Sequence, residues 1–142
     1  MSSTETRGVR NRNPGNIDLS PSNKWVGQLG LETGVPKPRF ARFDTPENGI
    51  RALGKLLLTY QRKHGLKTVK AIISRWAPSV ENDTGAYVRA VEANTGTRPG
   101  AEIDLTQPAV MAGFVKAIIQ HENAGFSYPA AVLAEGVRRA LL

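Results

Sequence analysis

Residues 106–123 read TQPAVMAGFVKAIIQHEN, and this stretch decides the fold. Its apolar residues recur at the three- and four-residue spacing of one helix face, namely Val110, Met111, Phe114, Val115, Ile118 and Ile119. The next position on that face is Glu122. The spacing therefore predicts a long core helix, capped by Thr106, that directs a carboxylate inward at its end.

Glu122 is the first candidate for chemistry. Burial removes the hydration of a carboxylate, and the C-terminus of a helix carries partial negative charge. Both effects favour the protonated form, and a carboxylic acid that keeps its proton near neutral pH can act as a general acid. The alternative is an ordinary Glu at a helix end, turned to solvent or paired with an Arg.

Composition limits what the protein can do. The chain of 142 residues has no Cys and only two His, His64 and His121. Disulfides and Cys nucleophiles are excluded, and we expect no metal and no cofactor. No apolar run could span a bilayer, and residues 1–10 lack the apolar core of a signal peptide. A net charge of +7 indicates a polyanionic partner, which could be nucleic acid, an anionic cell envelope or a membrane surface.

The remaining pattern predicts a mainly α (α+β) fold of about five to six helices. We expect a disordered tail over residues 1–8 and one domain over residues 9–142. Capping residues predict helices that begin near Thr45, Thr68, Asn82 or Asp83, Thr106 and Pro129. Two short strands are expected at 24–27 and 39–43, which form a small β element near the N-terminus.

Three polar or aromatic side chains are candidates for binding a sugar. Residues 10–17, RNRNPGNI, form a turn, and Asn13 and Asn16 offer amides suited to an N-acetyl or hydroxyl group. The alternative is that both amides close the turn. Trp25 has small or polar neighbours and could stack on a sugar ring or belong to the core.

Three segments together resemble the lytic transglycosylases of the lysozyme superfamily. They are FDTPENGIRALGKLLLTY (43–60), APSVENDTGAYVRAV (77–91) and AIIQHENAGFSYPAA (117–131). The resemblance implies that Glu122 is the catalytic acid and that Tyr87 lies beside it. It adds Asn82 to the substrate-binding candidates Asn13, Asn16 and Trp25. The pair that is usually Glu-Ser reads Glu122-Asn123 here, and His121 is not part of the family pattern.

The order of these segments differs from that of the superfamily. The helix with the catalytic Glu normally comes first, whereas here it lies near the end, and NRNPGNI looks like the turn that would follow it. The resemblance therefore implies a circularly permuted lysozyme-like domain. The whole pattern is also similar to small phage proteins that act on peptidoglycan, either in the virion or at host lysis.

The activity that this resemblance implies is cleavage of the β-1,4 bond between N-acetylmuramic acid and N-acetylglucosamine. A hydrolase would need a second carboxylate, for which Asp44, Glu47, Glu81 and Asp83 are available. A lytic transglycosylase needs only one acid, Glu122. Because no second acid stands out, the sequence favours the transglycosylase over the hydrolase. We expect a monomer made in the host cytoplasm that reaches the cell wall through a holin-type hole or as part of the virion.

Two other classes stay open. One is a structural virion protein that keeps the fold without activity. The other is a small basic nucleic-acid-binding module. Two features argue against it: Lys and Arg are scattered along the chain, and no helix carries a continuous basic face. We therefore expect no specific nucleic-acid partner.

Overall fold

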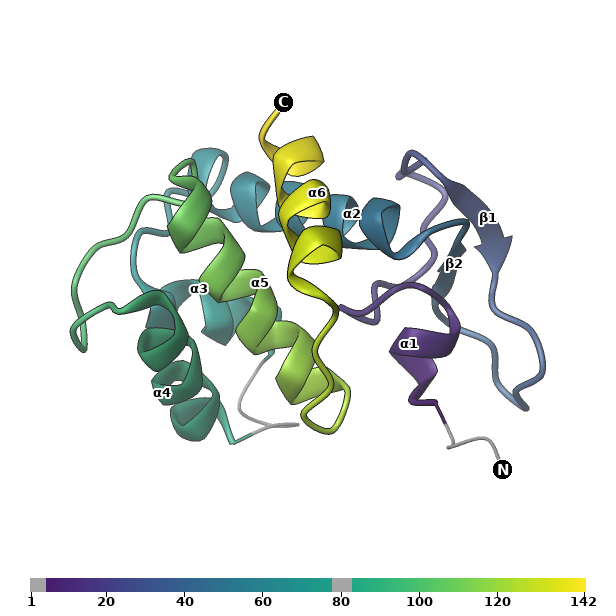
Figure 1. Cartoon of the computed structure of the whole chain (residues 1–142), viewed down its shortest axis with the longest axis horizontal. Coiled ribbons are helices and arrows are strands. Elements are labelled where there is room, and N and C mark those ends of the chain that lie inside the picture. The colour runs from purple at the N-terminus through teal and green to yellow at the C-terminus, as the bar shows by residue number, and fades with distance from the viewer. Residues whose placement is uncertain (1–4, 78–82) are drawn as a thin grey trace.

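The computed structural model describes residues 5–77 and 83–142, and this part of the chain is mainly helical with one small antiparallel sheet. The elements in chain order are α1 (Arg7–Arg10), β1 (Gln28–Leu31), β2 (Ala41–Phe43), α2 (Pro46–Arg62), α3 (Val69–Trp76), α4 (Thr84–Thr95), α5 (Pro108–Glu122) and α6 (Ala130–Leu141). In Figure 1 the sheet and α1 lie beside the larger helical part. The predicted fold class, mainly α with a small β element, is confirmed. Within the described ranges, no helix combines the length and apolar character needed to cross a membrane.

Three helices begin where capping residues predicted. Thr45, Thr68 and Asp83 precede α2, α3 and α4, and each accepts a hydrogen bond from the backbone N–H three residues further on. Such a bond satisfies one of the free N–H groups of a first helical turn. Of the two predicted caps of α4, Asp83 is the one used, while Asn82 lies outside the described residues. Gly96 ends α4 in the left-handed conformation, with φ of +72°.

Helix α5 is the core helix of the fold. Its apolar stripe is buried as the spacing predicted, and α5 packs against α4 and α6 while α2 packs mainly against α6. The predicted cap is wrong, because α5 begins at Pro108 and Gln107 precedes it without a side-chain bond. Thr106 instead donates its hydroxyl and its backbone N–H to the Asp104 carboxylate, at 2.7 and 2.9 Å, and so forms a turn before the helix.

The first strand lies further along the chain than predicted. Gly27 has φ of +79°, and the N–H of Gln28 donates to the carbonyl of Trp25 at 3.1 Å. This turn occupies the predicted strand 24–27, so β1 starts only at Gln28 and pairs antiparallel with β2. The second predicted strand, 39–43, overlaps β2 and is confirmed.

The tail predicted over residues 1–8 overlaps α1, which begins at Arg7. Residues 1–4 lie outside the described part, but Thr6 and Gly8 contact the end of α5. The Thr6 hydroxyl donates to Asn123 Oδ1 at 2.8 Å, and Gly8 is buried against the same amide. The polar residues that suggested a solvated tail are used for this contact, which holds the N-terminal turn against α5.

Candidate functional site

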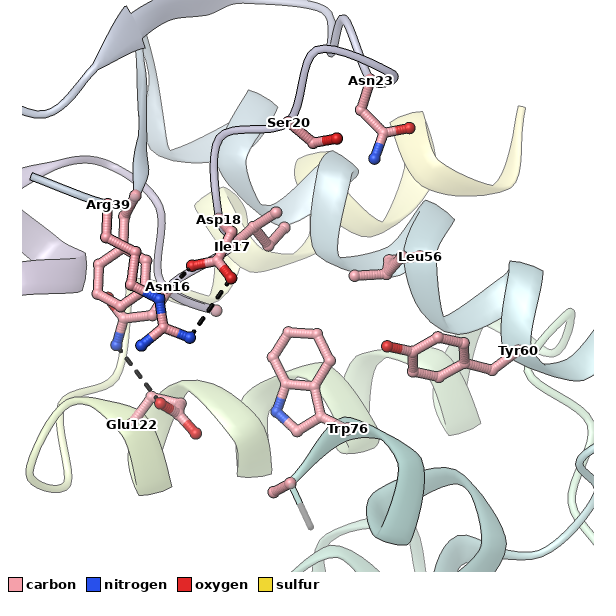
Figure 2. A pocket seen from close by; sticks show the side chains of 13 residues that line it. Asn16, Ile17, Asp18, Ser20, Asn23, Arg39, Leu56, Tyr60, Trp76 and Glu122 are labelled. Carbon is pink, nitrogen blue, oxygen red and sulfur yellow. Dashed lines mark hydrogen bonds and ion pairs between the residues drawn. The ribbon is translucent and has the colours of Figure 1, made fainter. Parts of the chain in front are cut away.

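Residues of the N-terminal turn, α2, α3 and the end of α5 line a cleft of about 470 Å³. Figure 2 shows the side chains that line it. Asn16, Asp18 and Arg39 come from the turn and the approach to β2, Leu56 and Tyr60 from α2, Trp76 from α3 and Glu122 from α5. The cleft is thus lined by both polar and aromatic groups.

Glu122 is half-buried at the last position of α5 and faces this cleft. Its carboxylate accepts two hydrogen bonds from distant parts of the chain. The Asn16 amide donates to Oε1 at 3.4 Å across 106 residues, and the Tyr87 hydroxyl donates to Oε2 at 3.1 Å. The two donors fix the orientation of the carboxylate. The structure therefore brings together three of the predicted site residues, Glu122, Asn16 and Tyr87.

Tyr87 is fully buried in α4 and links Glu122 to α3. Its hydroxyl donates to Glu122 and accepts a hydrogen bond from the indole N–H of Trp76 at 3.2 Å. Its ring stacks on His121, with centroids 3.7 Å apart. Burial raises the pKa of Tyr87 above its ordinary value, and the Glu122 carboxylate raises it further. The hydroxyl consequently stays protonated and available as a donor.

Asn123, which sequence analysis noted only as a departure from the family pair, is a structural centre of the site. It is buried, and its amide donates to the carbonyls of Pro14 and Ile119 at 2.8 and 2.9 Å. Its oxygen accepts the Thr6 hydroxyl. Asn123 therefore holds the N-terminal turn against α5, next to Glu122. A signal was present, because Asn123 lies four residues after Ile119 on the apolar face.

The prediction that Asn13 binds substrate is wrong. Asn13 is fully buried, and its amide donates to the carbonyls of Ile17 and Ala41, both at 2.9 Å. Its oxygen accepts the N–H of Ile17 at 3.0 Å. All of its polar groups are thus used to close the turn and attach it to β2, which was the stated alternative. Asn16, with φ of +51°, is the member of the pair that faces the cleft.

Trp25 and Asn82 are not brought to Glu122. Trp25 is half-buried and lines a neighbouring pocket of about 500 Å³, which shares Asn23 with the cleft. Its indole N–H is buried without a hydrogen-bond partner among the described residues. Asn82 lies outside the described part of the chain.

Asp18 is the second carboxylate in the cleft lining. Arg39 Nε donates to Asp18 Oδ1 at 2.6 Å, and the two side chains are largely exposed. Three predicted candidates for the second carboxylate do not line the cleft. Asp44 accepts a hydrogen bond from Asn48, Glu47 is in the first turn of α2 and Asp83 caps α4. Glu81 lies outside the described residues. Sequence reasoning missed Asp18 because no local pattern marks it, and only the fold brings it to the cleft.

Comparison with known proteins places the chain in a family with a bacteriophage member. Over 125 residues the chain is 40% identical to Protein P5 of Pseudoalteromonas phage PM2, and the match spans 86% of this chain and 74% of that protein. The chain therefore belongs to the family of Protein P5. No protein-family model matches it.

Proposed function

We propose that this protein is a peptidoglycan-cleaving enzyme that breaks the β-1,4 bond between N-acetylmuramic acid and N-acetylglucosamine. The observation that carries the proposal is the Glu122 carboxylate, held at a cleft by the Asn16 amide and the Tyr87 hydroxyl. Two of the three segments that resemble lytic transglycosylases supply Tyr87 and Glu122, while Asn16 comes from the N-terminal turn. In this proposal the domain is lysozyme-like and circularly permuted, since a turn from the start of the chain meets the acid near its end.

Glu122 would act first as the general acid. It donates its proton to the glycosidic oxygen while the bond from that oxygen to the anomeric carbon of the muramoyl residue breaks. The N-acetylglucosamine side leaves with a free hydroxyl, and positive charge develops at the anomeric carbon. In a lytic transglycosylase the muramoyl 6-hydroxyl then attacks that carbon and returns its proton to Glu122, which gives a 1,6-anhydro sugar. In a muramidase a water molecule takes the place of that hydroxyl.

Tyr87 would act as a positioning residue in this mechanism. Its hydroxyl contacts the reacting carboxylate, and Trp76 in turn fixes that hydroxyl. Asn16 contacts the other carboxylate oxygen and lines the cleft, so it is placed to contact both Glu122 and a bound sugar. A hydrolytic route would use Asp18 as the second carboxylate, whereas the transglycosylase route would not need it.

The test is digestion of purified bacterial cell walls, with mass spectrometry of the soluble products. Glu122→Gln should reduce lysis by about 10²–10⁴-fold, because general acid catalysis contributes on this scale. Glu102→Gln, at an exposed Glu outside the cleft, is the matched control and should lyse walls like the wild type. Normal lysis by Glu122→Gln would disprove the assignment of the acid.

Asp18→Asn separates the two chemistries. Anhydro-muramic products together with an active Asp18→Asn variant would identify a transglycosylase. Reducing-end muramic products together with an inactive Asp18→Asn variant would identify a muramidase. A folded wild-type protein that leaves walls intact would favour the remaining alternative, a non-catalytic virion protein with a lysozyme-like fold.

The proposal also includes where the enzyme acts. A member of a phage protein family that cleaves peptidoglycan would be made in the host cytoplasm, and would reach the wall through a holin-type hole or as a virion component. We propose that it works as a monomer, since the residues assigned to the reaction all come from one chain.

A further inference from the structure

Helix α2 carries a basic stripe that extends the polar surface beyond the cleft. Arg51, Lys55 and Arg62 follow one another at intervals of four and seven residues, so they share one helix face over a length of about 16 Å. The stripe is not a continuous basic face, because Leu58 and Thr59 lie between Lys55 and Arg62 in the same lining. The three cations are not adjacent in the sequence, because residues of other faces of α2 lie between them.

This stripe lines the pocket next to the cleft. Lys24, Lys63 and the Trp25 indole also line it, together with polar and apolar residues, and no Asp or Glu contributes to it. Among the described residues, none of the five cations forms an ion pair with a carboxylate side chain, and Lys55 donates to the carbonyl of Leu142 at 3.1 Å. We call this surface the basic groove. Its cations repel one another and no Asp or Glu side chain shares the lining, so an anionic ligand would be attracted to it.

The basic groove adjoins the cleft. Asn23 lines both, and in Figure 2 it lies at the end of the drawn lining opposite Glu122. A linear polymer that passes Glu122 and leaves the cleft at Asn23 would therefore enter the groove. Such a polymer would meet one aromatic ring, the apolar Val26 and Leu58, the polar Asn23 and Thr59, and five cations.

These features favour a carbohydrate chain that carries acidic groups. Sites for single-stranded nucleic acid stack successive bases on several aromatic side chains, whereas the groove offers only Trp25. The unpartnered indole N–H of Trp25 can donate to a carboxylate or hydroxyl oxygen if the ring shifts on binding.

We propose that the basic groove binds the carboxylates on the peptide side chains of the same glycan strand that the cleft cleaves. This inference rests on the proposed function, because it assigns the groove to a continuation of that substrate. The enzyme would then prefer peptide-bearing, charged cell-wall material over a neutral glycan of the same length. The attraction would weaken as salt rises.

The test is co-sedimentation with purified sacculi that are free of phosphate polymers, in a Glu122→Gln background so that the material stays intact. One sample of sacculi is left native, and in the other the carboxylates are converted to neutral amides. Arg51→Gln/Arg62→Gln should bind native sacculi about tenfold more weakly, since each charge-assisted contact to an anion contributes a few-fold in affinity. On the amidated sacculi the same variant should bind like its parent.

Lys70→Gln/Lys116→Gln is the matched control, because it removes two exposed cations that do not line the groove. Equal losses in the two double variants would overturn the proposal, as would an equal loss on native and amidated sacculi. Loss confined to a single-stranded oligonucleotide would also overturn it and identify a nucleic-acid site.

The two proposals can fail separately. If the wild type does not cleave walls but the charge-dependent loss appears, the proposed activity fails and the groove assignment stands. If the wild type cleaves walls and the groove variant binds both samples like its parent, the groove assignment alone fails.

Discussion

The Asn123 side chain donates a hydrogen bond to the Pro14 carbonyl at 2.8 Å, although the two residues are 109 positions apart in the chain. This bond joins the end of α5 to the N-terminal turn. Glu122 immediately precedes Asn123, and Asn16 lies two residues after Pro14, so the same contact brings Asn16 to the carboxylate. A buried amide therefore sets the geometry of the candidate acid without contacting the cleft.

Removing this amide should weaken the fold. Asn123→Ala leaves the buried carbonyl of Pro14 without its hydrogen-bond partner. A buried polar group without a partner lowers the free energy of unfolding by about 1–3 kcal/mol. We expect a loss of about 2–3 kcal/mol in the free energy of unfolding, measured by urea denaturation. Asn94→Ala, which removes an exposed amide bonded to Ala90, should change it by about 0.5 kcal/mol or less. Similar losses in the two variants would contradict the role given to Asn123.

Two helical glycines should respond in opposite directions to the same substitution. Gly49 in α2 packs directly on the N-terminal turn, where an added Cβ would lie 1.9 Å from the Arg12 carbonyl oxygen. Gly49→Ala should therefore destabilise the protein by about 1–3 kcal/mol. At Gly85 in α4 the nearest atom is the flexible end of Arg89, 3.3 Å away, so Gly85→Ala should stabilise by about 0.5–1 kcal/mol. Thermal unfolding of both variants checks the prediction, and a neutral Gly49→Ala would show that α2 does not touch the turn.

Stability should fall in acid because of Glu32. This carboxylate is buried and accepts hydrogen bonds from Arg7, from the backbone N–H groups of Arg39 and Phe40, and from Asn11. The Arg7 bond is the main cause that holds the pKa of Glu32 well below its ordinary value of 4.5. Because the pKa is lower in the folded state, the stabilisation is complete above pH 4.5 and is lost as the pH falls below it.

The measurement is urea unfolding at neutral pH and at pH values below 4.5. Glu32→Gln should be destabilised at neutral pH and should lose much of the decline seen in acid. Glu135→Gln is the control, since Arg138 and Arg139 lower the pKa of Glu135 to about 2 but solvent screens these exposed pairs. It should keep most of the decline, and an acid profile that Glu32→Gln leaves unchanged would exclude Glu32 as its source.

Loss of the Tyr87 hydroxyl should impair the proposed reaction more than binding. Tyr87→Phe removes the donor to Glu122 Oε2 and the acceptor for Trp76. We expect kcat on cell-wall fragments to fall about tenfold to a hundredfold, because small displacements of a reacting group cost that much. KM should stay near its wild-type value. Tyr128→Phe removes a buried hydroxyl with no partner among the described residues and should leave both parameters unchanged. A fall in affinity with normal kcat would reassign Tyr87 to substrate binding.

Local patterns predicted the helices because the signals are local. Thr45 and Thr68 cap helices as predicted, and the apolar stripe of α5 is buried as its spacing indicated. Failures occurred where a tertiary contact competes with a local preference. Thr106 bonds to Asp104 instead of capping α5, and a left-handed Gly27 moves the first strand along the chain.

The candidate site could be predicted only in part. Glu122 follows from the helical period and Tyr87 from the family resemblance, and both lie together in the structure. The sequence could not separate Asn13 from Asn16, because the two share one turn. Only the fold decides that the Asn13 amide is buried and that the Asn16 amide faces the cleft. Asp18 has no local signal at all, since its relation to the cleft depends on how the turn docks against α5.

The Asn16–Glu122 hydrogen bond has a consequence for the order of events during synthesis of the chain. A ribosome makes the asparagine 106 residues before the glutamate, so the pair cannot form until that intervening segment has been synthesised. Long-range closure of this kind is also slow compared with the formation of single helices. Translation products that stop before residue 122 would consequently lack the assembled pair on which the proposed reaction depends.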